Sequence, residues 1–508
     1  MSLDTALKIA QSGLLATQRQ LAITSQNVAN ATTTGYTRKS VTLSSADADG
    51  QPLGVRAGVT ARYVDQALVN QRNYRNASAQ AYSVRDTLLA GVESVYGAPT
   101  DGNTLGNVIN AIQSAFTNLR DAPADTGAQR EVLTAAANAA RLFNEAGQAI
   151  VDARQQAQDG IENEVKSIND SLRQIASLTE QIKSLSSSGL SSADLEDKRD
   201  QAIATLSEAL PVQTVRQSDG GVVLLGRNGI TLTLPTKGED ILSVAHAEVG
   251  VSSYYGGAGS LPGVTMNGVD VTSQLQGGRL AENITMRDQV LPRMMAEVDV
   301  AASELAARFD AVGLTLFTDL AGGVPDTSTG YTTGGAMGFS LTIQLNSAIS
   351  ADPTRLRDGT HDVTGSATGA SAFTMNPSGG PTGFTTLIDR VLDNAMGQEA
   401  QSGVAWAGFP ATGLGPDGTL TSTITSRTLT DYATEVSGSH AAVRAEAVSN
   451  QAGATALRDA LTARIDANSA VDSDTEMTNL VKLQNAYAAN ARVMSTVQSM
   501  YDALMAVR

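Results

Sequence analysis

The residues that could carry chemistry in this chain are few and scattered. Its three histidines, His246, His361 and His440, stand far apart, and none has a second histidine or a carboxylate cluster at the spacing of a metal site. The sequence contains no cysteine, which excludes disulfides, thiolate zinc sites, iron-sulfur clusters and a cysteine nucleophile. We therefore expect surface or core histidines, no metal and no cofactor.

Two acidic runs resemble chemical sites only in part. The run Asp47-Ala48-Asp49-Gly50 starts like a calcium loop but lacks the later ligands and the bidentate glutamate, so we predict a solvated turn. The second run comprises Asp194, Glu196, Asp197 and Asp200. Because Lys198 and Arg199 are interleaved with it, we interpret this run as a helix face with i,i+4 salt bridges rather than as an acid-base centre.

Catalytic motifs are absent from the sequence. It has no GxxxxGK[ST], no GxSxG and no GxGxxG. One alternative from another class is that residues 320–425 form a binding or hydrolytic module using Asp352, His361 and Asp362, although these three share no catalytic spacing. We therefore predict that the chain is not an enzyme.

Composition limits the partners. The formal net charge of -16 should repel nucleic acid and anionic lipid, so we expect neither DNA, RNA nor a membrane as a partner. No stretch approaches the roughly 18 apolar residues that a membrane helix requires. The start Met1-Ser2-Leu3-Asp4 lacks the charged and apolar blocks of a cleavable signal, so we expect that any export does not use the secretory pathway.

Both ends of the chain carry an apolar seam that alternates at three and four residues, as in a coiled coil. The seams comprise Leu3, Leu7, Ala10, Leu14, Thr17, Leu21, Thr24 and Val28 at one end, and Leu480, Leu483, Tyr487, Asn490, Met494, Val497, Tyr501 and Leu504 at the other. The first helix should end soon after Asn30, because three threonines and Gly35 follow. Ser473 and Glu476 form a capping box, so the last helix should begin at Asp474.

The interior divides by periodicity. Residues 126–187 predict one or two long helices, and 193–210 predict a returning helix that ends before Pro211, so together they make a helical hairpin. Residues 212–275 switch to period two and predict a small β insertion. Helical patterns resume at 279–314 and at about 428–468.

These patterns predict a mainly α protein with a β insertion, built as a nested, rod-like multidomain chain whose terminal helices pair as a coiled coil. The expected parts are a terminal assembly domain (1–60 and 471–508), a helical bundle (61–211, 277–320 and 426–470), a small β domain (212–276) and an outer region (321–425). The outer region holds six of the thirteen prolines and is rich in Gly, Ser and Thr, so we expect it to be irregular, partly β and surface-exposed.

The two ends also carry a family resemblance. Ser25-Gln26-Asn27-Val28-Ala29-Asn30, followed by Thr34-Gly35-Tyr36-Thr37-Arg38, resembles the N-terminal signature of the axial proteins of the bacterial flagellum, which include rod, hook and hook-associated proteins. The run from Asn479 to Tyr487, with Ala491-Arg492-Val493-Met494 and Met500-Tyr501, resembles their C-terminal signature. The long helical region, Asp194 to Gln201, and Gly277-Gly278-Arg279-Leu280 before Arg287-Asp288 resemble the hook-associated protein 1 family of hook-filament junction proteins.

The resemblance implies a structural subunit in the extracellular flagellum. Implied partners are copies of itself, the hook protein, the next hook-associated protein, the type III export apparatus and an export chaperone at the C-terminal helix. Another axial protein, of hook or distal rod, is the alternative, which a long helical hairpin at 126–187 would argue against. The basic bias of Lys8, Arg19, Arg38 and Lys39 fits either an uncleaved export signal or an ordinary helix surface.

We expect self-assembly through the apolar residues of both seams together with Asn27, Asn30, Gly35 and Tyr36. These four would cap the first helix and turn the chain outward, with Tyr36 against an adjacent subunit. A lone pair of helices buries little, so we also expect residues 1–35 and 475–508 to be largely disordered in the monomer and to fold on assembly.

Overall fold

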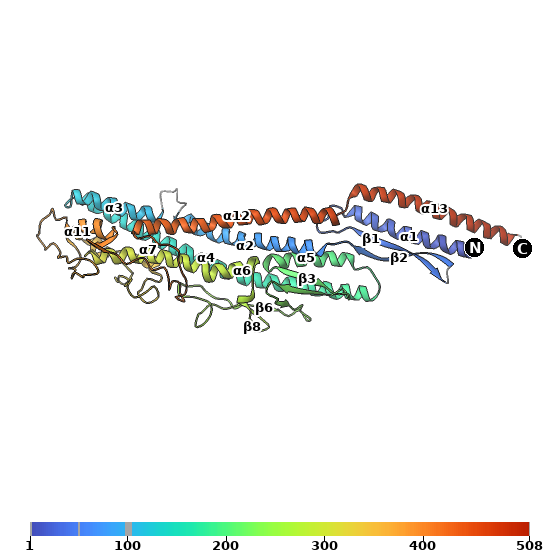
Figure 1. Ribbon diagram of the computed structural model, residues 1–508, viewed down its shortest axis with the longest axis horizontal. Coiled ribbons are helices and arrows are strands. Elements are labelled where there is room, and N and C mark those ends of the chain that lie inside the picture. Colours follow the sequence, from blue (N-terminus) through green and yellow to red (C-terminus); the bar gives the residue numbers. More distant parts are fainter. Residues whose placement is uncertain (1–2, 49–50, 97–103, 507–508) are drawn as a thin grey trace.

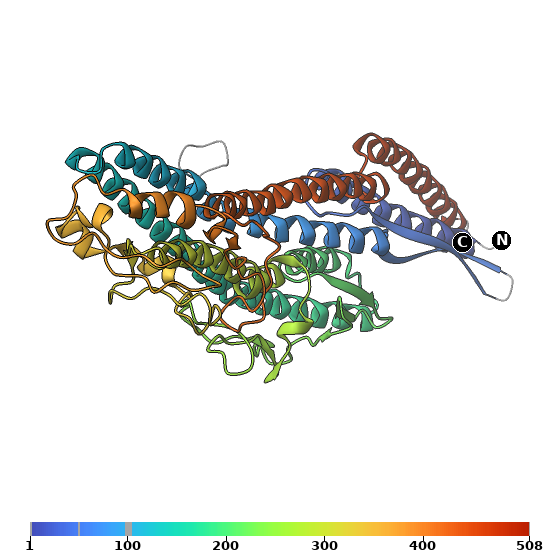
Figure 2. The ribbon, with the colours of Figure 1, turned by 60° about the vertical axis from the view of Figure 1, so that its left-hand side comes forward.

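The computed structural model describes residues 3–48, 51–96 and 104–506. They form an elongated rod of long helices, with short strands and loops along one side (Figure 1). Both ends of the chain lie together at one end of the rod, and the turned view in Figure 2 shows the same proximity. The fold is mainly helical with small antiparallel sheets, as the sequence predicted. No helix in the described ranges has the length and hydropathy needed to cross a bilayer.

The elements follow one another in a nested order. The long helices are α1 (Leu3–Ala29), α2 (Gln66–Tyr96), α3 (Leu105–Asp121), α4 (Thr126–Ser187), α5 (Ala193–Ala209), α6 (Gly278–Thr285), α7 (Leu291–Ala311), α12 (Leu429–Ser469) and α13 (Ser473–Ala506). The short helices are α8 (Phe339–Thr342), α9 (Ser347–Ala351), α10 (Arg355–Asp358) and α11 (Thr386–Arg390). Strands β1 (Lys39–Ala48) and β2 (Gln51–Arg62) form one sheet, and β9 (Phe317–Thr318) with β10 (Gln344–Leu345) and β11 (Glu399–Gln401) with β12 (Val404–Ala405) form two more.

The predicted helical hairpin is present, and α4 is a single helix of 62 residues. The side chain of Asp125 caps its start by accepting from the amides of Gly127 and Ala128. Its predicted seam, from Ile161 to Ile182, is buried. The chain reverses after Ser188, where Gly189 adopts a left-handed conformation with φ of +66°, and α5 returns along α4.

The helical stretch expected at 279–314 is interrupted by one π-helical turn, Met286–Val290, between α6 and α7. Pro292 lies in the first turn of α7. Proline has no amide hydrogen, so the regular i to i-4 ladder cannot run through this position and the wider turn accommodates the gap.

The β insertion is also confirmed. Strands β3 (Val212–Arg216), β4 (Val222–Gly226) and β5 (Thr231–Leu232) form an antiparallel sheet in that order, and β6 (Leu242–Ser243), β7 (Thr265–Met266) and β8 (Val269–Asp270) form a second. The predicted turn at 226–229 joins β4 to β5. Together with α4, α5 and α6 these strands enclose a separate cluster of buried side chains around Ile168, Leu206 and Leu224.

The hairpin of β1 and β2 was not predicted, and it occupies much of the second half of the 1–60 segment that we assigned to the terminal assembly domain. The two strands pair antiparallel from Lys39 with Arg62 to Ala48 with Gln51, with irregularities in register after Val41 and Ala46. Of the solvated turn predicted at 47–50, Asp47 and Ala48 are the last residues of β1, and Asp49 and Gly50 lie outside the described residues.

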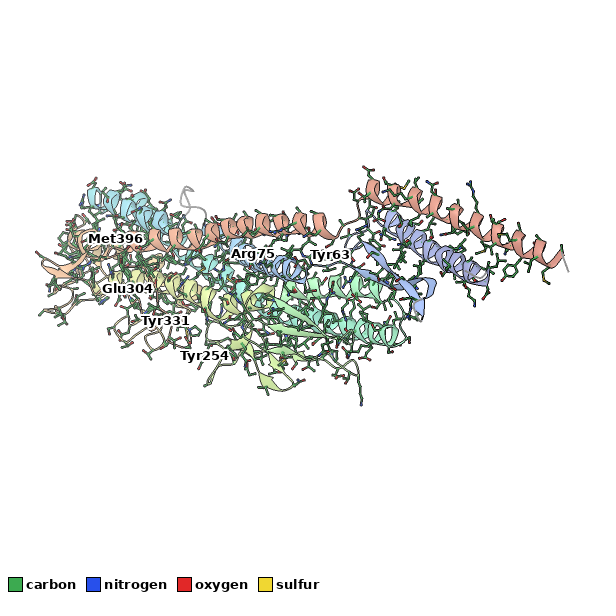
Figure 3. The ribbon with its side chains drawn as sticks, turned by 45° about the vertical axis from the view of Figure 1, so that its right-hand side comes forward. Tyr63, Arg75, Tyr254, Glu304, Tyr331 and Met396 are labelled. Atoms are coloured by element: carbon green, nitrogen blue, oxygen red, sulfur yellow. The ribbon has the colours of Figure 1, made fainter. Side chains whose placement is uncertain are left out.

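The prediction that residues 320–425 are surface-exposed is wrong for much of their length. Tyr331 and Met396, labelled in Figure 3, are buried. Phe339, Leu356 and Leu387 also join the main core formed by α2, α3, α4, α7 and α12. Prolines and glycines prevent regular elements in this segment but do not prevent its apolar side chains from packing, because burial depends on contact and not on periodicity.

A buried carboxylate fastens this irregular region to the bundle. Asp299 of α7 is fully buried and accepts hydrogen bonds from the Tyr331 hydroxyl at 2.7 Å, the Gly338 amide at 2.8 Å and the Ser340 amide at 3.0 Å. The loop amides therefore find on α7 the acceptors that a strand or helix would otherwise provide.

Asp299 gives the folded state a pH dependence. Burial, the dominant influence, raises the pKa of Asp299 to about 6 from a reference of 3.8, despite its three donors. Between these values the folded chain holds a proton that the unfolded chain releases, so the stability contributed by this group falls as the pH rises. We expect the free energy of unfolding of the wild type, relative to Asp299→Asn, to fall by about 2 kcal/mol between pH 4 and pH 7.

Urea denaturation of both proteins at intervals across this range measures the difference. Asp152→Asn is the matched control, because Asp152 is an exposed carboxylate on α4. Parallel pH profiles for the wild type and Asp299→Asn would contradict the assignment.

Candidate assembly site

The terminal helices α1 and α13 run antiparallel and pack against each other beyond the end of the body, as predicted (Figure 1). Ala10, Thr17, Thr24 and Val497 are buried in the seam, and Leu3, Leu7, Leu14, Leu21, Val28, Leu480, Leu483, Tyr487, Met494 and Tyr501 are half-buried. Leu504 was expected in the seam but is 62 % exposed, because it lies near the far end of α13.

Polar residues fix the register of this pair. The Asn490 side chain lies against Gly13, where a Cβ would come within 3.3 Å of its amide nitrogen. The Gln18 amide nitrogen lies 3.4 Å from the Tyr487 hydroxyl. Sliding the helices would move Asn490 away from the one glycine of α1 that leaves room for it, so it helps to define one alignment.

The β1–β2 hairpin covers a different face of α1. The Ser12 hydroxyl donates to the Ile9 carbonyl at 2.9 Å and accepts from the Val55 amide at 3.1 Å. Gly54, with φ of +125°, passes so close to Ser12 that a Cβ would clash with its hydroxyl. As a result α1 is packed on two sides, against α13 and against the hairpin.

Asn27 ends α1 by joining it to the hairpin. It is 1 % exposed, and its amide behaves like a strand partner for Lys39: Nδ2 donates to the Lys39 carbonyl at 2.9 Å, and Oδ1 accepts from the Lys39 amide at 3.1 Å. The Tyr36 hydroxyl donates to the same Oδ1 at 2.9 Å. Asn27 was predicted to cap α1, and its side chain instead links the end of α1 to the first residue of β1.

Asn30 and Gly35 shape the turn that follows, as expected. The Asn30 side chain donates to the Gln26 carbonyl at 3.0 Å, and Gly35 has φ of +77°. Tyr36 was expected to contact an adjacent subunit. That contact stays a prediction. Within its own chain, the centroid of the Tyr36 ring lies 3.5 Å from the Lys39 ammonium, and its hydroxyl is bonded to Asn27.

Behind this turn lies a cluster of charges that we call the joint, formed by the buried side chains of Lys39, Arg62 and Asp197, the half-buried Glu196 and Asp200, and the exposed Asp194. The Arg62 guanidinium reaches Glu196 at 2.9 Å, Asp197 at 2.8 Å and Asp200 at 2.8 Å, and the Lys39 ammonium reaches Asp194 at 2.6 Å and Asp197 at 3.1 Å. The α5 carboxylates form salt bridges, as predicted, but the predicted i,i+4 pairing is wrong. Their partners come from the hairpin, more than 130 residues away in sequence, and from Arg216 of β3, which pairs with Asp200 at 2.8 Å.

Local geometry explains why these charges are tolerated away from water. Asp197 also accepts from the Thr37 hydroxyl at 2.6 Å and the Thr37 amide at 3.3 Å. Burial lowers the pKa of Lys39, but its bonds to Asp194 and Asp197 outweigh burial and raise it. Burial raises the pKa of Glu196, but bonds from Ser192 and Arg62 outweigh it and lower that pKa. Both shifts favour the charged forms.

A second connection ties the start of α13 to the same turn. The Arg38 guanidinium pairs with Glu476 at 2.6 Å, and the Arg38 amide donates to the Ser469 carbonyl at 2.8 Å. The predicted capping box is wrong, because Asp472 caps α13 by accepting from the Asp474 and Thr475 amides, and Glu476 is buried against Arg38 instead. Arg38 and Lys39, seen in the sequence only as a basic bias, both have structural partners.

The other residues considered for chemistry lie apart from this site. His440 pairs with Glu297 at 2.7 Å in the core, and His246 lies 3.1 Å from Glu162 on the surface.

The three residues considered for a hydrolytic module each have a separate partner. His361 contacts the hydroxyls of Thr315 and Thr360, Asp362 accepts from the Met375 amide, and Asp352 accepts from Thr354. The structure therefore gives Asp352, His361 and Asp362 separate local partners and does not support a hydrolytic module. No group of three or more potential metal ligands occurs in the described ranges.

Removing the central cation of the joint should loosen the terminal pair from the body. The Arg62 side chain is 3 % exposed and the Asp197 side chain 7 %, so Arg62→Ala would leave Asp197 buried without its main partner. We expect a loss of about 3–5 kcal/mol in the free energy of unfolding and faster hydrogen exchange in α5 and residues 31–38.

Arg141→Ala is the control, because its i,i+4 pair with Glu145 is exposed and should be worth no more than about 0.5 kcal/mol. If Arg62→Ala is as mild as Arg141→Ala, the joint does not hold these elements.

Three family models match the chain. The "Flagellar hook-associated protein FlgK helical domain" matches residues 89–322, the "Flagella basal body rod protein" matches residues 7–37, and the "Flagellar basal body rod FlgEFG protein C-terminal" matches residues 466–507. The two end matches coincide with α1 and α13, and the internal match contains α4, α5 and the β insertion.

Curated relatives match over the whole length. Flagellar hook-associated protein 1 of Bacillus subtilis is 25 % identical over 98 % of this chain and 96 % of its own, and that of Escherichia coli is 24 % identical over 100 % of both. A solved structure, the flagellar hook junction protein FlgK from Burkholderia pseudomallei, is 26 % identical and covers 50 % of this chain and 45 % of that one, with a TM-score of 0.39. The helical-domain match and the full-length relatives agree with the geometry of the paired ends, and the chain belongs to the flagellar hook-associated protein 1 family, whose members are structural parts of the flagellum.

Proposed function

We propose that this chain is the structural subunit that joins hook to filament in the bacterial flagellum. The observation that carries the proposal is the combination of a FlgK-type helical body with terminal helices that stand away from it and pair only along one stripe. Such a subunit acts mechanically: its terminal pair joins the axial structure, and its body presents a surface to the next component.

The predicted self-assembly residues lie along the terminal pair and its turn. Among the described residues of α13 only Glu476 and Val497 are buried, although the helix is 34 residues long. Met477 and Met500 are at least half-exposed. Isolated helices are marginal in water, and burying one such side chain is worth about 1.5–3 kcal/mol, so neighbouring copies would supply the missing stabilisation.

The partners follow from this position in the flagellum. Copies of the same chain would lie beside it, with the hook protein on one side and the next hook-associated protein on the other. Export would pass through the type III apparatus to the extracellular flagellum. A cytoplasmic chaperone would hold the C-terminal helix by its apolar seam, because exposed aliphatic stripes favour aggregation.

A hook or distal rod protein is the second candidate, because the family models at both ends carry rod-protein descriptions. The long hairpin of α4 and α5, together with the hook-associated helical-domain match over it, favours the junction instead.

The first prediction concerns order in the free subunit. If assembly completes the terminal pair, the amides of α1 and α13 should exchange much faster than those of α4 and α7 in a verified monomer, and should become protected after incorporation. Hydrogen exchange followed by mass spectrometry measures this, with the buried amides of α4 as the internal reference. Firm protection of both terminal helices in the monomer would contradict it.

A second prediction separates assembly from folding. Leu480 and Leu483 are half-buried against α1, so replacing both with Asp should abolish incorporation into flagella and leave the thermal transition of the body nearly unchanged. Immunolabelling of sheared flagella locates the wild type and scores incorporation, and circular dichroism follows unfolding.

Val481→Asp is the control on the same helix, since Val481 is exposed. A collapse of the body transition in the double variant would mean that these leucines stabilise the body. Label along the filament, or absence of label at the junction in the wild type, would contradict the proposed location.

A further inference from the structure

A cleft of about 610 Å³ lies on the body between α2, α12 and the sheet of β3, β4 and β5. Its volume is within the range of ligand sites in proteins. Arg75, labelled in Figure 3, belongs to the wall that α2 provides. The cleft lies apart from the terminal pair, since neither α1 nor α13 contributes to its lining.

Two arginines from distant parts of the sequence meet at one aromatic ring in this cleft. The guanidinium carbon of Arg227, from the turn after β4, lies 5.1 Å from the centroid of the Tyr74 ring, and that of Arg75 lies 5.7 Å from it. Such contacts hold a guanidinium group by the negative face of the ring. Two like charges beside a single ring repel each other, so an anion that reaches both would be attracted to the cleft.

These two arginines have no carboxylate partner. Both are exposed, neither forms an ion pair within the described ranges, and none of the described residues that line the cleft is acidic. By contrast, Arg216 of β3 pairs with Asp200 at 2.8 Å, and Arg458 of α12 pairs with Asp459 at 2.7 Å. In a chain with a net charge of -16, two cations without carboxylates in one cleft indicate an acidic ligand by charge complementarity.

The cleft also has an apolar wall. Val212, Leu225 and Leu461 line it from the sheet and from α12. Leu457, which is also part of the lining, is 50 % exposed. An aliphatic group placed against this wall is stabilised because apolar surface on both sides leaves water. A ligand that fits the cleft therefore combines a carboxylate with an aliphatic side chain.

The backbone of a peptide would also find partners here. The side-chain amides of Asn70, Gln71 and Gln213 line the cleft, and each amide can both donate and accept. Within the described chain β3, which contains Gln213, pairs only with β4 and is an edge strand of its sheet. Edge strands bind extended peptides by adding them to the sheet.

We propose that this cleft binds an extended segment of a partner protein that carries carboxylates next to aliphatic side chains. The carboxylates would accept hydrogen bonds from Arg75 and Arg227, and an aliphatic side chain would lie against Leu457 and Leu461. This inference goes beyond the proposed function, because the cleft is complete in one chain and would bind its ligand in the free subunit. A nucleic acid fits less well, since a strand of phosphates requires more cations than two.

Fluorescence anisotropy of the purified full-length chain tests the proposal with a labelled hexapeptide that alternates glutamate and leucine. We expect saturable binding that weakens as salt rises and falls at least tenfold when glutamine replaces glutamate in the peptide. Arg75→Gln combined with Arg227→Gln should also weaken binding at least tenfold, because two charge-assisted hydrogen bonds are lost. Arg120→Gln combined with Arg130→Gln is the matched control, since these exposed arginines lie on α3 and α4 and their removal changes the net charge equally.

A carboxylate built into the cleft gives an independent test. Leu457→Asp would bring a carboxylate to the two arginines and should compete with the peptide, so binding should fall at least tenfold. Val448→Asp is the control on the same helix, because Val448 is 44 % exposed and lies outside the lining of the cleft. Circular dichroism checks that all variants unfold at similar temperatures.

Several results would overturn the proposal. These are no binding of the peptide to the wild type at millimolar concentration, equal binding by the cleft variants and their controls, and complete competition by millimolar inorganic phosphate, which would indicate a site for any small anion. If a labelled oligodeoxynucleotide of six residues binds more tightly than the peptide, the cleft is a nucleic-acid site instead.

Discussion

The buried charges of the joint are the interaction on which the placement of the chain ends depends. The chain passes between the terminal pair and the body at three points: after α1, after β2 and before α13. Lys39 holds the segment after α1 against α5, and Arg62 holds the segment after β2 against the same helix. Arg38 holds the start of α13 through Glu476. Charge-assisted hydrogen bonds are directional, whereas apolar contact is not, so this arrangement fixes an orientation as well as a position.

Stability alone does not account for such a cluster. Removing several charges from water is costly, and well-packed apolar residues often stabilise a protein as much. What the joint adds is geometry, because each carboxylate of α5 accepts from a defined donor on the hairpin or the turn. A subunit that transmits force between a body and a terminal pair requires that defined angle. The thin contact of the pair with the body makes the joint the place where the angle is set.

The terminal pair itself is asymmetric. Helix α1 has α13 on one side and the hairpin on another, while α13 leaves most of its surface uncovered. Several large apolar side chains of α13, among them Met477, Val493 and Met500, are therefore at least half-exposed.

Comparison of the sequence with the structure separates two kinds of information. Periodicity located α4, α5, α12 and both terminal helices, because a helix that buries one face must repeat its apolar residues at three and four positions. It missed the β1–β2 hairpin, which has irregular register and sparse large apolar residues. It also misjudged residues 320–425, whose burial comes from Asp299 and scattered apolar side chains that have no period to detect.

The joint marks the limit of the sequence most clearly. Asn27, Gly35 and the acidic residues of α5 were all noticed, but their partners were not, because the distance from Arg62 to Asp197 is 135 residues along the chain and 2.8 Å in space. By itself the sequence determined the helices, their seams, the absence of cysteine chemistry and the resemblance at both ends. Only the tertiary structure decided which charges meet, because pairing depends on how α5 and the hairpin fold back on each other, and no local pattern encodes that approach.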